Sequence, residues 1–143
     1  MSTLSLVEST AMKFAAYRHI GHRGVQGYTE SSAIGLLHAV DDYQRASGIN
    51  GPIAEIGVHH GQLFIAMKLL QRPGEAAIAI DLFEDQDANI DNSGEGDRGE
   101  FLRHLDRWAD RENPPNQHPP SCLVATHHPG WHADAHHWRR TSQ

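Results

Sequence analysis

Apolar residues recur at steps of three and four along residues 29–48, a spacing that predicts an amphipathic helix. Thr29 can cap the first amides of this helix, Glu30 suits its positive first turn, and Gly48 can close it in the left-handed conformation. One stripe is expected to face the core, with Asp41 facing elsewhere. The members of this stripe are Ala33, Leu36, Leu37, Val40 and Tyr43.

Two short apolar runs flank a second helical stretch. Residues 53–58 and 76–80 each follow a turn that contains glycine and proline, and both are predicted to be strands buried on both faces. Between them, residues 63–70 carry apolar side chains around most of a short helix. A strand, helix and strand of this length usually form a right-handed crossover between parallel strands. The sequence therefore predicts a βαβ unit of an α/β sheet.

The segments on either side of this unit are less regular. Residues 1–20 have a weak helical pattern, and the glycine-rich residues 19–28 predict a loop. Residues 82–97 are acidic and turn-rich, which predicts a surface loop. Asp97 and Glu100 then match a capping box, which opens a third amphipathic helix.

The composition changes again near residue 113. Residues 1–112 are interpreted as one α/β unit, and residues 113–143 as a tail rich in proline and histidine. The apolar run Cys122–Ala125 is compatible with one short strand. The rest of the tail has no clear period and is expected to be extended, disordered or non-native.

Composition and charge exclude several classes of protein. A chain of 143 residues with 38% hydrophobic content fits one domain with a modest core. The net charge of −6 provides no general attraction for phosphates, which argues against nucleic-acid binding. The chain has no apolar run near the roughly 20 residues of a membrane span, no secretion-signal pattern, and a single cysteine, Cys122. We expect a cytoplasmic protein without membrane or nucleic-acid partners.

The first predicted strand ends in a turn with Gly57 and Gly61 that opens a helix. Such a turn presents free amides and the positive end of a helix to a ligand. The second strand should end beside it, and there the sequence places Asp81, followed by Leu82 and Phe83. A carboxylate at this point can accept two hydrogen bonds from a ribose diol, and apolar neighbours can pack on an adenine face.

These residues resemble a known family. Glu55, Gly57 and Gly61 in the pattern ExGxxxG, followed by AIAIDLF with its acidic strand end, resemble the first two cofactor motifs of class I methyltransferases that depend on S-adenosylmethionine. The segments GPIAEIGVHHGQLF and AIDLFEDQDANIDNSGEGD look most like a bacterial branch related to macrocin O-methyltransferases and cephalosporin hydroxylase-type proteins. The resemblance covers residues 27–110. It implies a partial Rossmann-like, doubly wound parallel sheet.

The resemblance also implies roles for single residues. Gly57 and Gly61 would lie against the methionine part of S-adenosylmethionine, with Glu55 near its amino group. Asp81 would bind the ribose, and the two apolar residues after it, Leu82 and Phe83, would lie near adenine.

His59 and His60 lie between the two glycines and are in reach of the cofactor carboxylate or the substrate. They are also interpreted as simple turn residues, and neither is assigned a catalytic role. The implied reaction is methyl transfer to a small molecule, with a hydroxyl as the acceptor group. The sequence identifies no catalytic base.

The resemblance stops near residue 111, whereas methyltransferases of this class complete a seven-stranded sheet. We therefore expect a truncated domain that lacks part of the adenine pocket and the acceptor site. The exposed sheet edge of such a domain is compatible with homo-oligomers. One alternative is a non-catalytic nucleotide-binding remnant without turnover. Another, an NAD-dependent oxidoreductase fragment, ranks last because GxGxxG requires glycine where His59 stands.

Two segments have compositions compatible with metal binding, and no metal is predicted at either. The acidic loop over residues 84–97 does not match the spacing of a calcium-binding EF-hand loop and is interpreted as a solvated charge run. His128, His132 and His136 recur every fourth residue, which on a helix would suit zinc. Pro129 interrupts this pattern and favours a disordered tail instead.

Overall fold

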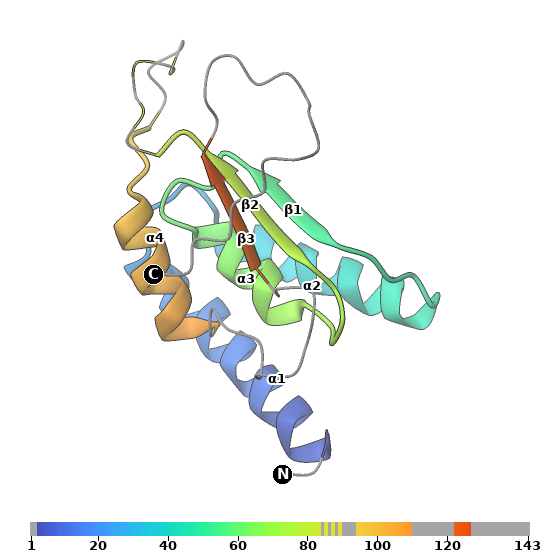
Figure 1. Cartoon of the computed structure of the whole chain (residues 1–143). Helices are drawn as coiled ribbons and strands as arrows, with labels where there is room; N and C mark the ends of the chain where they lie inside the picture. The colour runs from blue at the N-terminus through green and yellow to red at the C-terminus, as the bar shows by residue number, and fades with distance from the viewer. Residues whose placement is uncertain are drawn as a thin grey trace.

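The computed structural model describes residues 3–83, 85, 87, 89, 94–109 and 122–126. These residues form four α-helices, one 3₁₀ turn and a three-stranded sheet, so the chain is a mixed α/β protein as predicted (Figure 1). In chain order the elements are α1 (Thr3–His19), η1 (Gly21–Gly24), α2 (Ser31–Ala46), β1 (Ile53–Ile56), α3 (Gln62–Leu70), β2 (Ala77–Asp81), α4 (Arg98–Trp108) and β3 (Cys122–Thr126). Within these ranges, no helix combines the length and the apolar character needed to cross a membrane.

The described strands form a parallel sheet in the order β1-β2-β3. Ile53 pairs with Ala77 and Ile56 pairs with Ile80. The short strand predicted around Cys122 is β3, which lies beside β2. Because α3 connects β1 to β2, the predicted strand, helix and strand form the expected parallel unit.

The hydrophobic core lies between the sheet and the helices; in Figure 1, α1 and α3 lie below the sheet and α4 lies to its left. The ring of Phe101 on α4 packs against Phe64 of α3 at 5.5 Å and against Phe83, beyond β2, at 5.8 Å between ring centres. This aromatic cluster fixes α4 against the carboxyl end of the sheet. The largest fully buried side chains are Tyr17, Ile34, Phe64, Ile65, Phe83, Phe101 and Leu105.

The prediction that β1 is buried on both faces is wrong. Residues along β1 alternate between partly buried and exposed, and Ile56 is 82% exposed. The described helices cover one face of β1, and none of the described strands pairs with its outer edge. Alternation of this kind is typical of a strand that is covered on one side only.

The predicted core-facing stripe of α2 is confirmed at Leu37, which packs against the core, and is wrong at its other four members. Ile34 and Asp41 are buried, whereas Leu36, Val40 and Tyr43 are 67%, 44% and 68% exposed. The period of the helix was recognised, but the face that contacts the rest of the chain is rotated from the predicted one. An apolar row therefore remains on the outside of α2.

Asp41 lies on the inner side of α2 because two guanidinium groups neutralise it. Its carboxylate accepts hydrogen bonds from Arg45 at 2.6 Å and from Arg72 at 3.0 Å. A buried carboxylate needs such partners. The start of α2 differs as well, since Glu30 rather than Thr29 is the N-cap and its side chain makes no capping hydrogen bond.

The start of α4 follows the sequence prediction. The Asp97 carboxylate accepts a hydrogen bond from the Glu100 amide at 2.7 Å, which satisfies one free amide of the first turn. Residues 84, 86, 88 and 90–93 of the predicted acidic loop lie outside the described residues. So does the predicted tail, apart from β3.

Candidate functional site

The turn between β1 and α3 is built from left-handed backbone conformations. Gly57 has φ +83° and Gly61 has φ +90°, values that glycine adopts without a steric penalty. Gly61 is also closely packed, because a Cβ there would lie 2.5 Å from Cδ2 of Phe101. Between the glycines, His59 has φ 57°, which is uncommon for a residue with a side chain. The result is a tight loop that holds the His59 amide toward the end of β2.

The carboxylate of Asp81 joins this turn to the end of β2. Its Oδ2 accepts a hydrogen bond from the His59 amide at 2.6 Å, and its Oδ1 accepts one from the Phe83 amide at 2.7 Å. The ends of β1 and β2 therefore lie side by side, as the sequence predicts. Gly96 lies against the same carboxylate, since a Cβ there would be 3.0 Å from Oδ1. Each carboxylate oxygen retains capacity for a further donor.

Glu55 lies on β1 close to Asp81, and its side chain is partly buried. Among the described residues, its Oε2 has no hydrogen-bond partner. Burial raises the pKa of Glu55 to about 8, and the charge of Asp81 contributes to the rise. Burial, together with the charge of Glu55, also raises the pKa of Tyr17. The strand next to the turn thus carries a carboxyl group that is largely protonated at neutral pH and has one oxygen without a hydrogen-bond partner.

The two histidines of the turn contact each other. Nδ1 of His59 lies 2.8 Å from Nδ1 of His60 and 3.3 Å from the carbonyl oxygen of Gln26. A proton on Nδ1 of His59 accounts for both contacts, with His60 as an acceptor. Burial lowers the pKa of His60, and neighbouring His59 lowers it further, in agreement with a neutral ring. His60 is buried, whereas His59 is partly exposed beside the ring of Tyr28, so His59 is the histidine accessible to a ligand.

The structure separates the two apolar residues expected near adenine. Leu82 is partly exposed after the end of β2. Phe83 is fully buried, and its ring stacks on Phe101 with an interplanar angle of 22°. The side chain of Phe83 therefore belongs to the core in this structure.

One polar residue near the turn was missed by the sequence analysis. Gln62, the first residue of α3, accepts a hydrogen bond from the Thr29 amide at 2.7 Å and donates one to the His22 carbonyl at 2.9 Å. The backbone carbonyl of Gln62 accepts a hydrogen bond from the Tyr17 hydroxyl at 2.7 Å. These bonds hold the segment between α1 and α2 against the start of α3. The available signal was a polar residue at the head of an otherwise apolar helix.

No group of three or more His, Cys, Asp or Glu side chains in the described part of the chain could hold a metal ion. The acidic loop over residues 84–97 is described only in part, and the histidine pattern over residues 128–136 lies outside the described residues. Neither segment contributes a described metal site.

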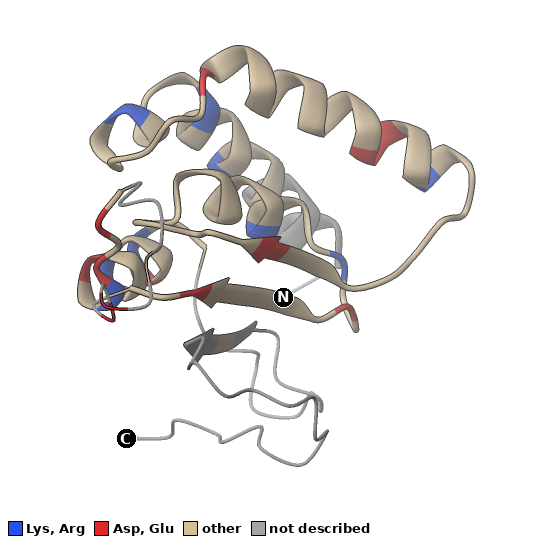
Figure 2. Cartoon of the chain, turned by 90° about the horizontal axis from the view of Figure 1, so that it is seen from above, with Lys and Arg blue, Asp and Glu red and all other residues tan. Residues whose placement is uncertain are grey.

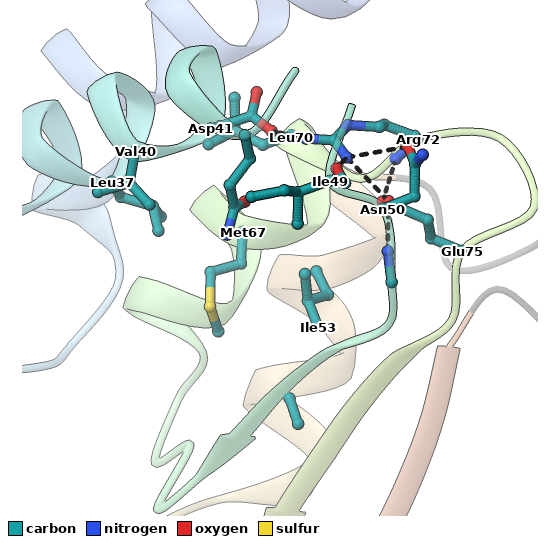
Figure 3. A pocket seen from close by; sticks show the side chains of 13 residues that line it. Leu37, Val40, Asp41, Ile49, Asn50, Ile53, Met67, Leu70, Arg72 and Glu75 are labelled. Carbon is teal, nitrogen blue, oxygen red and sulfur yellow. Dashed lines mark hydrogen bonds and ion pairs between the residues drawn. The ribbon is translucent and has the colours of Figure 1, made fainter. Parts of the chain in front are cut away.

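A cavity of about 310 Å³ lies at the other end of β1 (Figure 3). Its walls come from α2, α3 and the first half of β1, and they include Leu37, Met67 and Ile53. Neither the Gly57–Gly61 turn nor Asp81 lines it. The cavity is therefore a feature distinct from the turn.

The chain matches no family model, no curated protein and no solved structure in the comparisons with known proteins. The function must be argued from the residues of this chain.

Proposed function

We propose that the chain binds S-adenosylmethionine at the Gly57–Gly61 turn, as the cofactor-binding part of a methyltransferase-like domain with a doubly wound, Rossmann-like sheet. One observation carries this proposal: the Asp81 carboxylate is hydrogen-bonded to the His59 amide at 2.6 Å. It brings together the glycine turn and the acidic strand end, the two motifs on which the family resemblance rests.

The polar groups around the turn match those of the cofactor. The methionine part carries an ammonium group, which is the kind of donor that Oε2 of Glu55 needs. Its carboxylate suits the free amides and the positive end of α3. The ribose hydroxyls can donate to the remaining lone pairs of Asp81. Leu82 remains as the apolar contact for adenine.

When bound, the cofactor supplies a sulfonium methyl group that is already activated for transfer. The residues of the chain would bind and orient it, and orientation of two reactants can contribute roughly 7–11 kcal/mol to a rate acceleration. The resemblance implies a small-molecule hydroxyl as the acceptor, whose proton a base must take. We assign none of the described residues to that role.

A binding module or remnant without turnover is the second candidate, and one observation favours it. Both oxygens of Asp81 already accept backbone amides, and Gly96 lies against Oδ1. The same hydrogen bonds are expected in a turn that is stabilised by Asp81 and binds no ligand. A remnant of this kind predicts no cofactor binding.

Calorimetric titration with S-adenosylmethionine and with its demethylated product, S-adenosylhomocysteine, tests the proposal. We expect saturable binding of both ligands that Asp81→Asn weakens about tenfold or more, since a ribose hydrogen bond to a charged group contributes about 1.5–3 kcal/mol. Asp42→Asn on α2, where the side chain is 66% exposed, is the matched control and should bind normally. Absence of heat with the folded wild-type chain would support the remnant.

The role of Glu55 gives a second readout. Because its pKa is about 8 in the free protein, Glu55 is protonated at pH 6.5 and must ionise to pair with an ammonium group. Binding at pH 6.5 should therefore release close to one proton, measured from the binding heats in buffers of different ionisation enthalpy. Glu55→Gln should remove this release. Binding without proton release would contradict the assigned role of Glu55.

A further inference from the structure

The outer edge of β1 has unpaired peptide groups. The amides of Ile53 and Gly57 donate hydrogen bonds to the carbonyls of Ala76 and Ile80, respectively. The N–H and C=O groups of the odd-numbered residues of β1 therefore point toward β2. In a strand, successive peptide groups point to opposite sides. Those of Ala54 and Ile56 therefore point away from β2, where the described sheet has no further strand.

Helix α2 extends along this open edge. Figure 2 shows it beyond β1 on the side away from β2, and residues of α2 line the same cavity as Ile53 and Ala54 of β1. The exposed residues Leu36, Val40 and Tyr43 are spaced by four and three positions, so they form one row along the helix. An apolar row beside an unpaired strand edge is a candidate interaction surface.

The cavity of about 310 Å³ lies between this helix and the edge. Its apolar wall is formed by Leu37, Val40, Ile53, Met67 and Leu70 (Figure 3). A strand that paired with β1 would direct every second side chain to the helix side of the sheet, toward this wall. The cavity can thus accept apolar side chains from an added strand.

The charges at the far end of the cavity are balanced. Asp41 pairs with Arg45 and Arg72, and Arg72 also pairs with Glu75 at 3.3 Å. Two carboxylates and two guanidinium groups leave no net charge to attract a charged partner. Nε of Arg72 is buried and has no hydrogen-bond partner among the described residues, so it can donate to a neutral acceptor such as a peptide carbonyl. The groove therefore favours an uncharged peptide segment with apolar side chains.

We propose that the β1 edge and the exposed row of α2 form a docking groove for an extended peptide segment with alternating apolar side chains, which adds to the sheet as a fourth strand. Only an extended chain can pair with the outward peptide groups of Ala54 and Ile56 while filling the cavity with alternate side chains. A second copy of the chain is disfavoured as the occupant. If the β1 edges of two copies paired antiparallel, α2 of each copy would enter the helix layer that α2 and α3 of the other copy occupy (Figure 2).

The experiment uses the full chain and a short fluorescein-labelled peptide in which valine alternates with threonine. We expect the peptide to bind by fluorescence anisotropy, and a peptide of the same composition with a central proline not to bind. Amide hydrogen exchange followed by NMR should slow about tenfold or more at Ala54 and Ile56 when the peptide binds. The amides of Ile53 and Gly57, already bonded within the sheet, should change little and provide an internal control.

Two variants test the two halves of the groove. Ala54→Pro removes an outward amide without breaking a bond to β2, and it should weaken peptide binding about tenfold. Val40→Asp places a carboxylate in the apolar row and should weaken binding by a similar or larger factor. Ile20→Asp, at a residue that is 74% exposed beyond the end of α1, is its matched control and should bind normally.

Several outcomes would overturn the proposal. One is equal affinity of the wild type and the folded Val40→Asp variant, and another is slowed exchange elsewhere than at Ala54 and Ile56. If both edge amides are already protected without peptide, a sedimenting dimer would identify a second copy as the occupant. A monomer with protected edge amides would instead identify another segment of the same chain as the occupant.

Discussion

Replacing Glu55 with glutamine should change how the stability of the protein depends on pH. The pKa of Glu55 is raised from its ordinary value of 4.5 to about 8, mainly by burial. The folded state therefore holds this proton more tightly than the unfolded state, and the contribution to stability is greatest below pH 4.5 and is lost as the pH rises through 8. At about 1.36 kcal/mol per pH unit the full loss would be about 4–5 kcal/mol. Because solvent reaches part of the side chain, we expect about 2–3 kcal/mol.

Urea unfolding of the wild type and of Glu55→Gln between pH 5 and pH 9 measures this effect. The difference between the two proteins isolates Glu55, since the many histidines contribute equally to both. The variant should be similar to the wild type at pH 5 and more stable by about 2–3 kcal/mol at pH 9. Glu30→Gln, at the exposed start of α2, is the control and should give a constant difference. A constant difference for Glu55→Gln as well would refute the reasoning about its burial.

Three further predictions concern stability, and urea unfolding measures each of them. Gly61→Ala should destabilise the fold by about 3 kcal/mol or more, since its Cβ would lie 2.5 Å from a ring carbon of Phe101. Gly57→Ala should cost only about 1–2 kcal/mol, because Gly57 has φ +83° but open space around the position of a Cβ. Equal losses for the two variants would contradict this reasoning. Tyr17→Phe removes a buried hydrogen bond to a backbone carbonyl of α3 and should cost about 1–3 kcal/mol, and an unchanged midpoint would show that the bond is not important. Asp97→Ala removes the side-chain cap of α4 and should lower the urea midpoint, while Asp97→Asn, which can still cap the helix, should restore most of the loss.

The strand, helix and strand unit was predictable because its signals are local. The runs at β1 and β2 are apolar, both follow turn residues, and the helix between them is of ordinary length for a crossover. The proximity of Asp81 to the glycine turn followed from the parallel arrangement alone, since parallel neighbours end at the same edge. The cap of α4 at Asp97 is local as well.

The faces of the elements were not predictable in the same way. A helical period identifies an apolar stripe on α2, but it does not show whether the stripe packs against the core of the same chain. Asp41 became an inner residue only because Arg72, 31 positions later, folds back to neutralise it. Phe83 followed the acidic strand end as an adenine contact would, yet its ring joined the distant Phe101 in the core. Such outcomes depend on tertiary partners rather than on spacing.

Three unfavourable features lie at the carboxyl end of the sheet, and together they support a ligand there. Oε2 of Glu55 has no hydrogen-bond partner among the described residues, and His59 and Phe83 both have left-handed backbone conformations. Such features cost on the order of 1–3 kcal/mol each. At the opposite end of β1, the carboxylate of Asp41 is fully paired, and the one buried side-chain atom without a partner among the described residues there is Nε of Arg72. The amides that bond to Asp81 explain the shape of the turn but leave Oε2 of Glu55 unsatisfied. A ligand that brings a donor to Glu55 would restore the missing hydrogen bond, and a turn kept for its own stability would gain from an apolar residue at that position.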